Sequence, residues 1–157
     1  MAAREPIRGV LFDKDGTLFD FAATWRGAAE SVLTTLAKGD VDAARRIGDA
    51  VGFDPRTGAF AAGSPLVAGS TREVAEILAR EVPGLKADAL ERAADAAAQA
   101  ARPAPAAPDL PVLLDALKAA GLALGVATHD SAASARAHLA EAGALDRFDF
   151  IAGYDSG

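Results

Sequence analysis

Two aspartates near the N-terminus are the residues of this chain best suited to catalysis. They lie in the segment GVLFDKDGTLFD, residues 9–20, where Asp13 and Asp15 follow an apolar run that ends at Phe12. Along an extended chain, residues two apart point to the same side, so both carboxylates could serve one reaction centre. The alternative is a plain turn, because Asp and Gly are common turn residues. The position at the end of a strand favours the catalytic interpretation, since open α/β sheets bind their ligands there.

A second polar segment, GVATHDS at residues 125–131, also follows an apolar run. Thr128 either ends a strand before a capped helix or presents its hydroxyl to a ligand. His129 follows it, and the only other histidine is His138. We expect His138 on the surface of the next helix, so the sequence does not predict a histidine metal site.

The composition limits the partners of the protein. The net charge is −6 with a pI near 4.8, and no basic run occurs, which argues against nucleic acid and anionic membranes as partners. An anionic substrate would therefore need a local positive group, such as a metal ion or a helix N-terminus. With no cysteine and with charges at Arg4, Glu5 and Arg8, the sequence predicts no disulfide and no signal peptide. It also contains no apolar stretch near the ~20 residues of a membrane span. These features predict a soluble, cytoplasmic protein.

Three short apolar runs predict the strands of a parallel sheet. They lie at residues 7–12, 122–128 and 148–153, and we expect the first two to be buried. A helical pattern at 110–121 precedes the second run, and another, capped by Asp130 or Ser131, precedes the third. Strands that alternate with helices of this length indicate right-handed βαβ units and an α/β fold.

Between the first strand and residue 106 the pattern is helical and predicts four helices. Each is expected to begin at a residue that can cap it: Thr24, Asp40, Ser70 and Asp88. Glu73 and Glu91 would complete capping boxes at the last two. Residues 53–69 predict a loop, and the segment RPAPAAP at 102–108 predicts a stiff, extended linker.

The segment FDKDGTLFD resembles motif I of the haloacid dehalogenase superfamily of phosphotransferases, and GVATHDS resembles its motif II. The resemblance implies a Rossmann-like parallel sheet, of which three strands are present here. It also implies a helical cap inserted directly after motif I. On this basis the chain divides into an α/β core, residues 1–19 and 107–157, and a helical cap, residues 20–106.

The same resemblance assigns a role to each motif residue. Asp13 would attack phosphorus and become an aspartyl phosphate. Asp15 would protonate the leaving oxygen and then activate water. Lys14, Thr128 and His129 would bind the phosphate, His129 through its backbone N–H. A Mg²⁺ cofactor would bind at Asp13 and at the backbone carbonyl of Asp15.

Asp15 distinguishes the branches of this superfamily, because ion-pumping ATPases carry threonine there and dehalogenases lack the acid. The sequence therefore predicts a phosphatase, similar to phosphoglycolate phosphatases, that acts on a small phosphorylated metabolite. A sugar-phosphate mutase, and a truncated, inactive binding module, are the alternatives. Trp25, Arg56 and Arg72 of the cap could contact the substrate, although packing for Trp25 and solvation for the arginines are favoured.

Two further motifs of the superfamily, a lysine after the third strand and an acidic pair after the fourth, have no match, and no lysine follows Lys118. We therefore expect these residues to be the N-terminal portion of a longer protein. The strand at 7–12 is central in the superfamily but would here be an exposed apolar edge, through which copies of the chain could associate.

Overall fold

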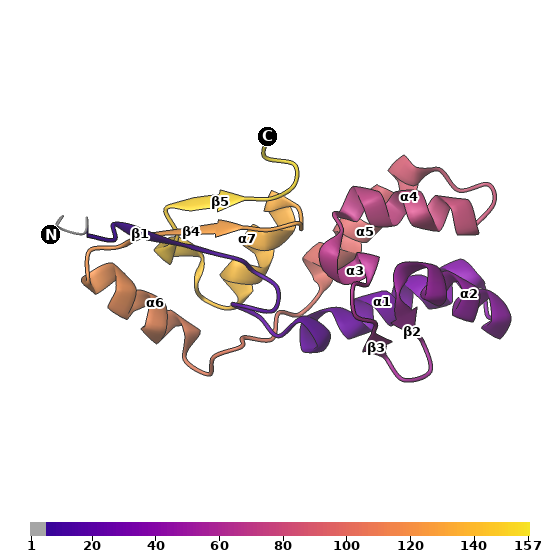
Figure 1. Cartoon of the computed structure of the whole chain (residues 1–157), viewed down its shortest axis with the longest axis horizontal. Coiled ribbons are helices and arrows are strands. Elements are labelled where there is room, and N and C mark those ends of the chain that lie inside the picture. The colour runs from indigo at the N-terminus through magenta and orange to yellow at the C-terminus, as the bar shows by residue number, and fades with distance from the viewer. Residues whose placement is uncertain (1–5) are drawn as a thin grey trace, which may run out of the picture.

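An α/β part and a group of helices lie at opposite ends of an elongated molecule (Figure 1). The structure is a computed structural model that describes residues 6–157; Arg4 and Glu5, on which the signal-peptide expectation rests, lie outside these residues. The α/β part consists of strands β1 (Gly9–Phe12), β4 (Ala123–Ala127) and β5 (Phe150–Ala152), helices α6 (Leu110–Ala119) and α7 (Ala132–Glu141), and the 3₁₀ turn η1 (Leu145–Arg147). The predicted α/β fold is confirmed.

The three strands form a parallel sheet in the order β1-β4-β5. On one face, Leu124, Val126 and Ile151 are buried in an apolar cluster that includes residues of α6 and α7. The strand at 7–12 is not buried as predicted, because Leu11 lies on the face of the sheet that α6 and α7 do not cover and is 64% exposed. Its place at the edge of the sheet within the described residues matches the expectation of an exposed strand.

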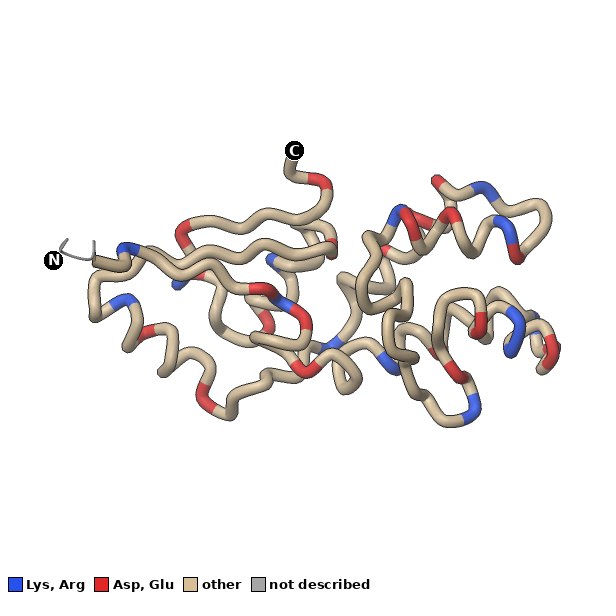
Figure 2. Tube along the Cα trace, in the orientation of Figure 1, with Lys and Arg blue, Asp and Glu red and all other residues tan. Residues whose placement is uncertain are grey.

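The helices between β1 and α6 enclose a second apolar cluster. They are α1 (Phe21–Ala37), α2 (Val41–Val51), α3 (Pro65–Ala68), α4 (Thr71–Glu81) and α5 (Ala87–Ala100), with a hairpin of β2 (Phe53–Asp54) and β3 (Ala59–Phe60). The buried members of this cluster come only from residues 29–90, whereas those of the sheet cluster come from residues 18–19 and 110–151. Acidic and basic residues are distributed over both parts (Figure 2).

The chain passes between the two parts twice, and the two passages pair with each other. The Asp20 N–H donates to the Ala104 carbonyl at 2.8 Å, and the Ala106 N–H donates to the Leu18 carbonyl at 2.9 Å. The prediction of an extended linker at 102–108 is confirmed only in part, because residues 102–105 are free of helix and turn, whereas 106–108 form bends and a turn. Each passage thus satisfies one backbone N–H and one carbonyl of the other.

Helix starts were only partly predictable. Asp40 caps α2, and Ser70 forms the predicted capping box with Glu73 at α4. The prediction for Thr24 is wrong: Asp20 caps α1, and the buried Thr24 hydroxyl accepts a hydrogen bond from the Ala104 N–H instead. A tertiary partner 80 residues away decides the role of this threonine.

Two other local predictions are also wrong. Helix α5 begins at Ala87 without a side-chain cap, so Asp88 lies in the first turn, where its charge favours the helix dipole. Residues 53–69 form the β2–β3 hairpin and α3 rather than a plain loop. The rings of Phe53 and Phe60 pack 4.9 Å apart across the hairpin. Strands of two residues are too short for a periodic pattern to reveal.

Candidate active site

The two polar segments leave the sheet at the same edge. Strands β1 and β4 are parallel neighbours with Phe12 opposite Val126, so Asp13–Asp15 and Thr128–Asp130 follow directly at their carboxyl ends. This is the edge at which open parallel sheets bind ligands.

Asp13 is the more accessible of the two motif aspartates. Its side chain is exposed, and its Oδ1 accepts a hydrogen bond from the backbone N–H of Lys14 at 2.8 Å. This bond fixes one carboxylate oxygen close to the end of the strand. The other oxygen is positioned to meet an electrophile or a cation from solvent.

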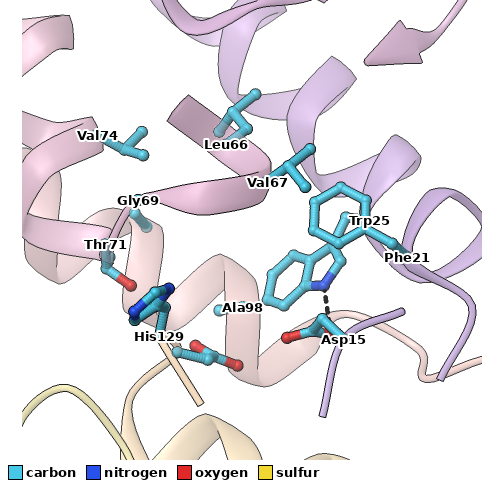
Figure 3. Close-up of a pocket in the computed structure, with 12 residues that line it drawn as sticks. Asp15, Phe21, Trp25, Leu66, Val67, Gly69, Thr71, Val74, Ala98 and His129 are labelled. Carbon is cyan, nitrogen blue, oxygen red and sulfur yellow. Dashed lines mark hydrogen bonds between the residues drawn. The ribbon is translucent and has the colours of Figure 1, made fainter. Parts of the chain in front are cut away.

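Asp15 is held by partners from both parts of the molecule. Its Oδ1 accepts a hydrogen bond from the indole N–H of Trp25 on α1 at 2.8 Å (Figure 3). The ammonium of Lys14 donates to the same oxygen at 3.0 Å and lies 3.0 Å from Oδ2. The carboxylate is therefore fixed in orientation by an indole on one side and an ammonium on the other.

Lys14 is fully buried and joins four side chains. Besides Asp15, its Nζ lies 3.1 Å from Asp130 Oδ2 and 3.0 Å from His138 Nδ1, and 5.0 Å from the centre of a Trp25 ring. The contact with Asp130 is a close ion pair and not a directed hydrogen bond, since that oxygen has no hydrogen-bond partner among the described residues. A buried ammonium needs such partners, because an unpaired charge is costly away from water.

His138 is completely buried, so the prediction that it lies on the surface is wrong. Its Nε2 lies 2.8 Å from the Ala98 carbonyl, to which it can only donate, and Nδ1 then accepts from the Lys14 ammonium. Burial, with the charge of Lys14 as the second cause, lowers the pKa of His138 and keeps the ring neutral. The histidine thereby links α7 to α5.

The residues predicted to bind phosphate have different surroundings. The Lys14 ammonium is enclosed by its partners, so only the backbone at this position faces the candidate site. The Thr128 hydroxyl accepts a hydrogen bond from the Asp130 N–H at 3.2 Å, and His129 is exposed beside Thr71 (Figure 3). Contact of Lys14, Thr128 and His129 with phosphate stays a prediction.

Two residues of this arrangement were not predicted from the sequence. Asp130 was expected only as a helix cap, and Trp25 mainly as a packing residue. Asp130 is buried and pairs with Lys14, which is distant in the sequence. No local sequence pattern indicates this pairing. Arg56 and Arg72 do lie at the surface as favoured, and both pair with carboxylates there.

A cavity of about 120 Å³ opens beside Asp15, between the strand ends and the helices (Figure 3). Its polar lining comes from both parts of the molecule. The residues that line it are Asp15, Phe21, Trp25, Leu66, Val67, Gly69, Thr71, Val74, Ala94, Ala98, His129 and Asp130.

The oxygen ligands at this edge suit Mg²⁺ in part. Among residues 6–157, no three His, Asp or Glu side chains converge closely enough to hold a metal ion by themselves. Mg²⁺, however, is commonly held by one or two carboxylates together with substrate phosphates and water. The exposed carboxylate of Asp13 meets that requirement, whereas the carboxylate of Asp15 is already occupied by Lys14 and Trp25.

Comparisons with known proteins show the family of this chain. The model of the haloacid dehalogenase-like hydrolase family matches residues 7–157. Among solved structures, the chain is similar to a predicted phosphoglycolate phosphatase from Haemophilus somnus 129PT, with 16% identity, a TM-score of 0.59 and coverage of 99% of this chain and 66% of that one. An L-2-haloacid dehalogenase from Xanthobacter autotrophicus matches with 20% identity, a TM-score of 0.49 and coverage of 96% and 58%.

A further dehalogenase structure matches with 19% identity, a TM-score of 0.50 and coverage of 98% of this chain and 65% of that one. The chain thus spans 58–66% of the length of these structures. No curated protein matches at the same level of significance. At these identities, the structural similarity shows the fold. Within residues 6–157, no helix has the length and apolar character required to cross a membrane.

Proposed function

Since this chain belongs to the haloacid dehalogenase-like hydrolase family, we propose that it supplies the nucleophile and the acid–base residue of a Mg²⁺-dependent phosphatase. The substrate would be a small phosphate monoester, and the reaction would pass through an aspartyl phosphate. The observation that carries this proposal is the pairing of an exposed Asp13 with an Asp15 that Trp25 and Lys14 hold in place.

The first half of the reaction uses both carboxylates. An oxygen of Asp13 attacks phosphorus, the bond between phosphorus and the alcohol oxygen breaks, and protonated Asp15 gives its proton to the departing alkoxide. A carboxylate can act as this nucleophile at neutral pH without a base, and the covalent route replaces one difficult displacement with two easier ones. Mg²⁺ bound at Asp13 and the Asp15 carbonyl would offset the negative charge of the phosphate.

The second half regenerates the site. The Asp15 carboxylate takes a proton from water, the water oxygen attacks phosphorus, and the bond from Asp13 to phosphorus breaks. Asp15 is suited to both halves because the Trp25 indole and the Lys14 ammonium fix its orientation throughout. Thr128 and the backbone N–H of His129 would orient the phosphoryl oxygens at the end of β4.

The test is hydrolysis of 4-nitrophenyl phosphate with Mg²⁺, combined with mass spectrometry of the peptide that contains residues 9–20. We expect a phosphate adduct on Asp13 and loss of turnover in Asp13→Asn, because an amide is a poor nucleophile. Asp40→Asn is the matched control, since an exposed Asp that caps α2 can be replaced by Asn with little effect.

Three outcomes would contradict the proposal. Substantial activity in Asp13→Asn, or an adduct elsewhere, would exclude the covalent role of Asp13. Transfer of the phosphoryl group to a second sugar phosphate would indicate a mutase. Binding of phosphate analogues without any turnover would indicate an inactive binding module.

A further inference from the structure

The cavity beside Asp15 is apolar except at the end nearest the strands. Phe21, Trp25, Leu66, Val67 and Val74 supply most of its walls, and the carboxylate of Asp15, the proposed acid at the leaving oxygen, lies at its polar end with Asp130. None of the described residues that line it is a lysine or an arginine. The part of a substrate beyond its phosphate would therefore meet hydrocarbon.

A second cavity, of about 90 Å³, extends this apolar surface into the helices. It shares five lining residues with the first: Phe21, Trp25, Leu66, Val74 and Ala94. All of its remaining lining residues are also apolar: Ala28, Ala29, Val32, Leu33, Val51, Phe60, Leu78 and Ala97. The substrate side of the site thus continues toward the centre of the helical cluster.

Two positive groups that are adjacent in the sequence to lining residues of the cavity are already engaged. Lys14 is buried against Asp15, Asp130 and His138, and Arg72 forms ion pairs with carboxylates on the helix surface. A second anionic group on the substrate would lose its hydration without gaining a cation and would also approach two carboxylates. Each of these effects opposes its binding.

We propose, building on the phosphatase function above, that the substrate is a monoester of a neutral alcohol with a small apolar body, alkyl or aryl. An apolar cavity of about 150 Å³ can hold a benzene molecule, so a cavity of about 120 Å³ suits a group of similar or smaller size. Phosphoglycolate does not meet this description, because its carboxylate would lie against the apolar walls of the cavity.

The decisive experiment compares substrates that differ only by methyl and carboxylate: ethyl phosphate with 2-phosphoglycolate, and butyl phosphate with 4-phosphooxybutanoate. We expect kcat/KM to be at least about tenfold higher for each alkyl ester, since even one methylene group in an apolar pocket is worth ~10–200-fold and a carboxylate in place of the methyl group also loses its hydration. Equal or higher values for the carboxylates would overturn the proposal.

A variant that adds a positive charge to the cavity wall tests the same substrate preference. Val67→Arg puts a cation at the partly exposed wall of the cavity and should shift the preference several-fold toward the carboxylate substrates. Val41→Arg, on the exposed face of α2 and away from the cavity, should not. An unchanged preference in Val67→Arg would show that this wall does not contact the substrate.

A binding measurement decides the inference independently of catalysis. Trp25 is the single tryptophan of the chain and lines both cavities, so its fluorescence reports their occupancy. We expect 1-butanol to change the emission and glycolate to leave it unchanged at equal concentration.

Two matched substitutions on α5 control this titration. Ala94→Phe fills the wall shared by both cavities and should abolish the response to butanol, whereas the exposed Ala93→Phe should not. A response to glycolate, or one that survives Ala94→Phe, would contradict the inference. Absence of phosphatase activity with an intact butanol response would contradict only the proposed reaction.

Discussion

The two parts of the molecule contribute different kinds of side chain to the candidate site. The α/β part brings carboxylates, a buried ammonium and a neutral histidine, and the Lys14 ammonium lies within 3.1 Å of Asp15, Asp130 and His138. The helical part brings mostly hydrocarbon, together with two polar groups, the indole N–H of Trp25 and the hydroxyl of Thr71. Charge and chemistry thus come from the strand ends, and the shape of the cavity comes from the helices.

The two parts also differ in how completely they cover their apolar residues. Helices α1, α2, α4 and α5 surround their cluster on several sides. The sheet is covered on the face that contacts α6 and α7, whereas Leu11 and Phe150 are 64% and 58% exposed on either side of Gly125. The helical part is thus the more self-contained of the two.

The largest effect that would test this division is expected at Asp15. Asp15→Asn should lower steady-state hydrolysis of an alkyl phosphate by ~10²–10⁴-fold, because acid–base help at the leaving oxygen and at water is lost. Phosphorylation of Asp13 by a reactive donor should persist, and mass spectrometry should detect a longer-lived adduct. A variant with unchanged turnover would show that another group is the acid and base.

The next effect is on stability and concerns the buried ammonium. Lys14→Met should lower the free energy of unfolding by about 3–5 kcal/mol, because it leaves Asp130 buried without its cation. Lys118→Met is the matched control: its pair with Asp149 is partly exposed, and its loss should cost at most about 1 kcal/mol. Urea unfolding of both variants measures the difference, and similar values would contradict a structural role for the Lys14 cluster.

Much of the fold could be predicted from local patterns. Apolar runs located the three strands of the sheet, and Asp40 and Ser70 marked helix starts because their capping partners are only two or three residues away. The prediction for Thr24 failed because its hydroxyl accepts a hydrogen bond from the Ala104 N–H, which lies on the other passage between the two parts.

The candidate site was predictable only where a motif carried it. Asp13 and Asp15 are adjacent to a recognisable strand end, so type and spacing were sufficient to select them. The burial of Lys14 and His138 arises from contacts 124 residues apart in the chain. A lone histidine on a helix gives no local sign that a lysine from another element will meet it.

A smaller effect concerns the open face of the sheet. We expect the 157-residue chain to self-associate with increasing concentration, because Leu11 and Phe150 expose apolar surface next to an unpaired edge strand. Phe150→Ser should weaken association about tenfold, which corresponds to ~1.4 kcal/mol. Val112→Ser, an equally apolar change at an exposed position on α6, should not. Sedimentation that shows a monomer at every concentration would refute the expectation.

The smallest effect is expected where the two parts meet at Asp95 of α5. One oxygen of this carboxylate is buried without a hydrogen-bond partner among the described residues. Burial, followed by the nearby charges of Asp130 and Glu91, raises the pKa of Asp95 above its ordinary value of 3.8. At a pH between the ordinary pKa of the unfolded chain and the higher pKa of the folded protein, the folded protein keeps a proton on Asp95 that the unfolded chain has released. This group therefore lowers the free energy of unfolding as the pH rises through that range.

Asp95→Asn removes this penalty and should raise the free energy of unfolding at pH 7, by less than about 1 kcal/mol because solvent screens much of the carboxylate. The gain should shrink as the pH is lowered toward the raised pKa of Asp95, because the native carboxyl then takes up a proton. Asp88→Asn, the same change about two turns earlier on α5, should act in the opposite direction, since it removes a charge that favours the helix N-terminus by a few tenths of a kcal/mol. Thermal unfolding of both variants between pH 4 and pH 8 measures the two signs. If Asp95→Asn lowers the free energy of unfolding at pH 7, the carboxylate of Asp95 is not destabilised by burial and by repulsion from Asp130. The contact between the helices and the sheet would then gain stability from this charge.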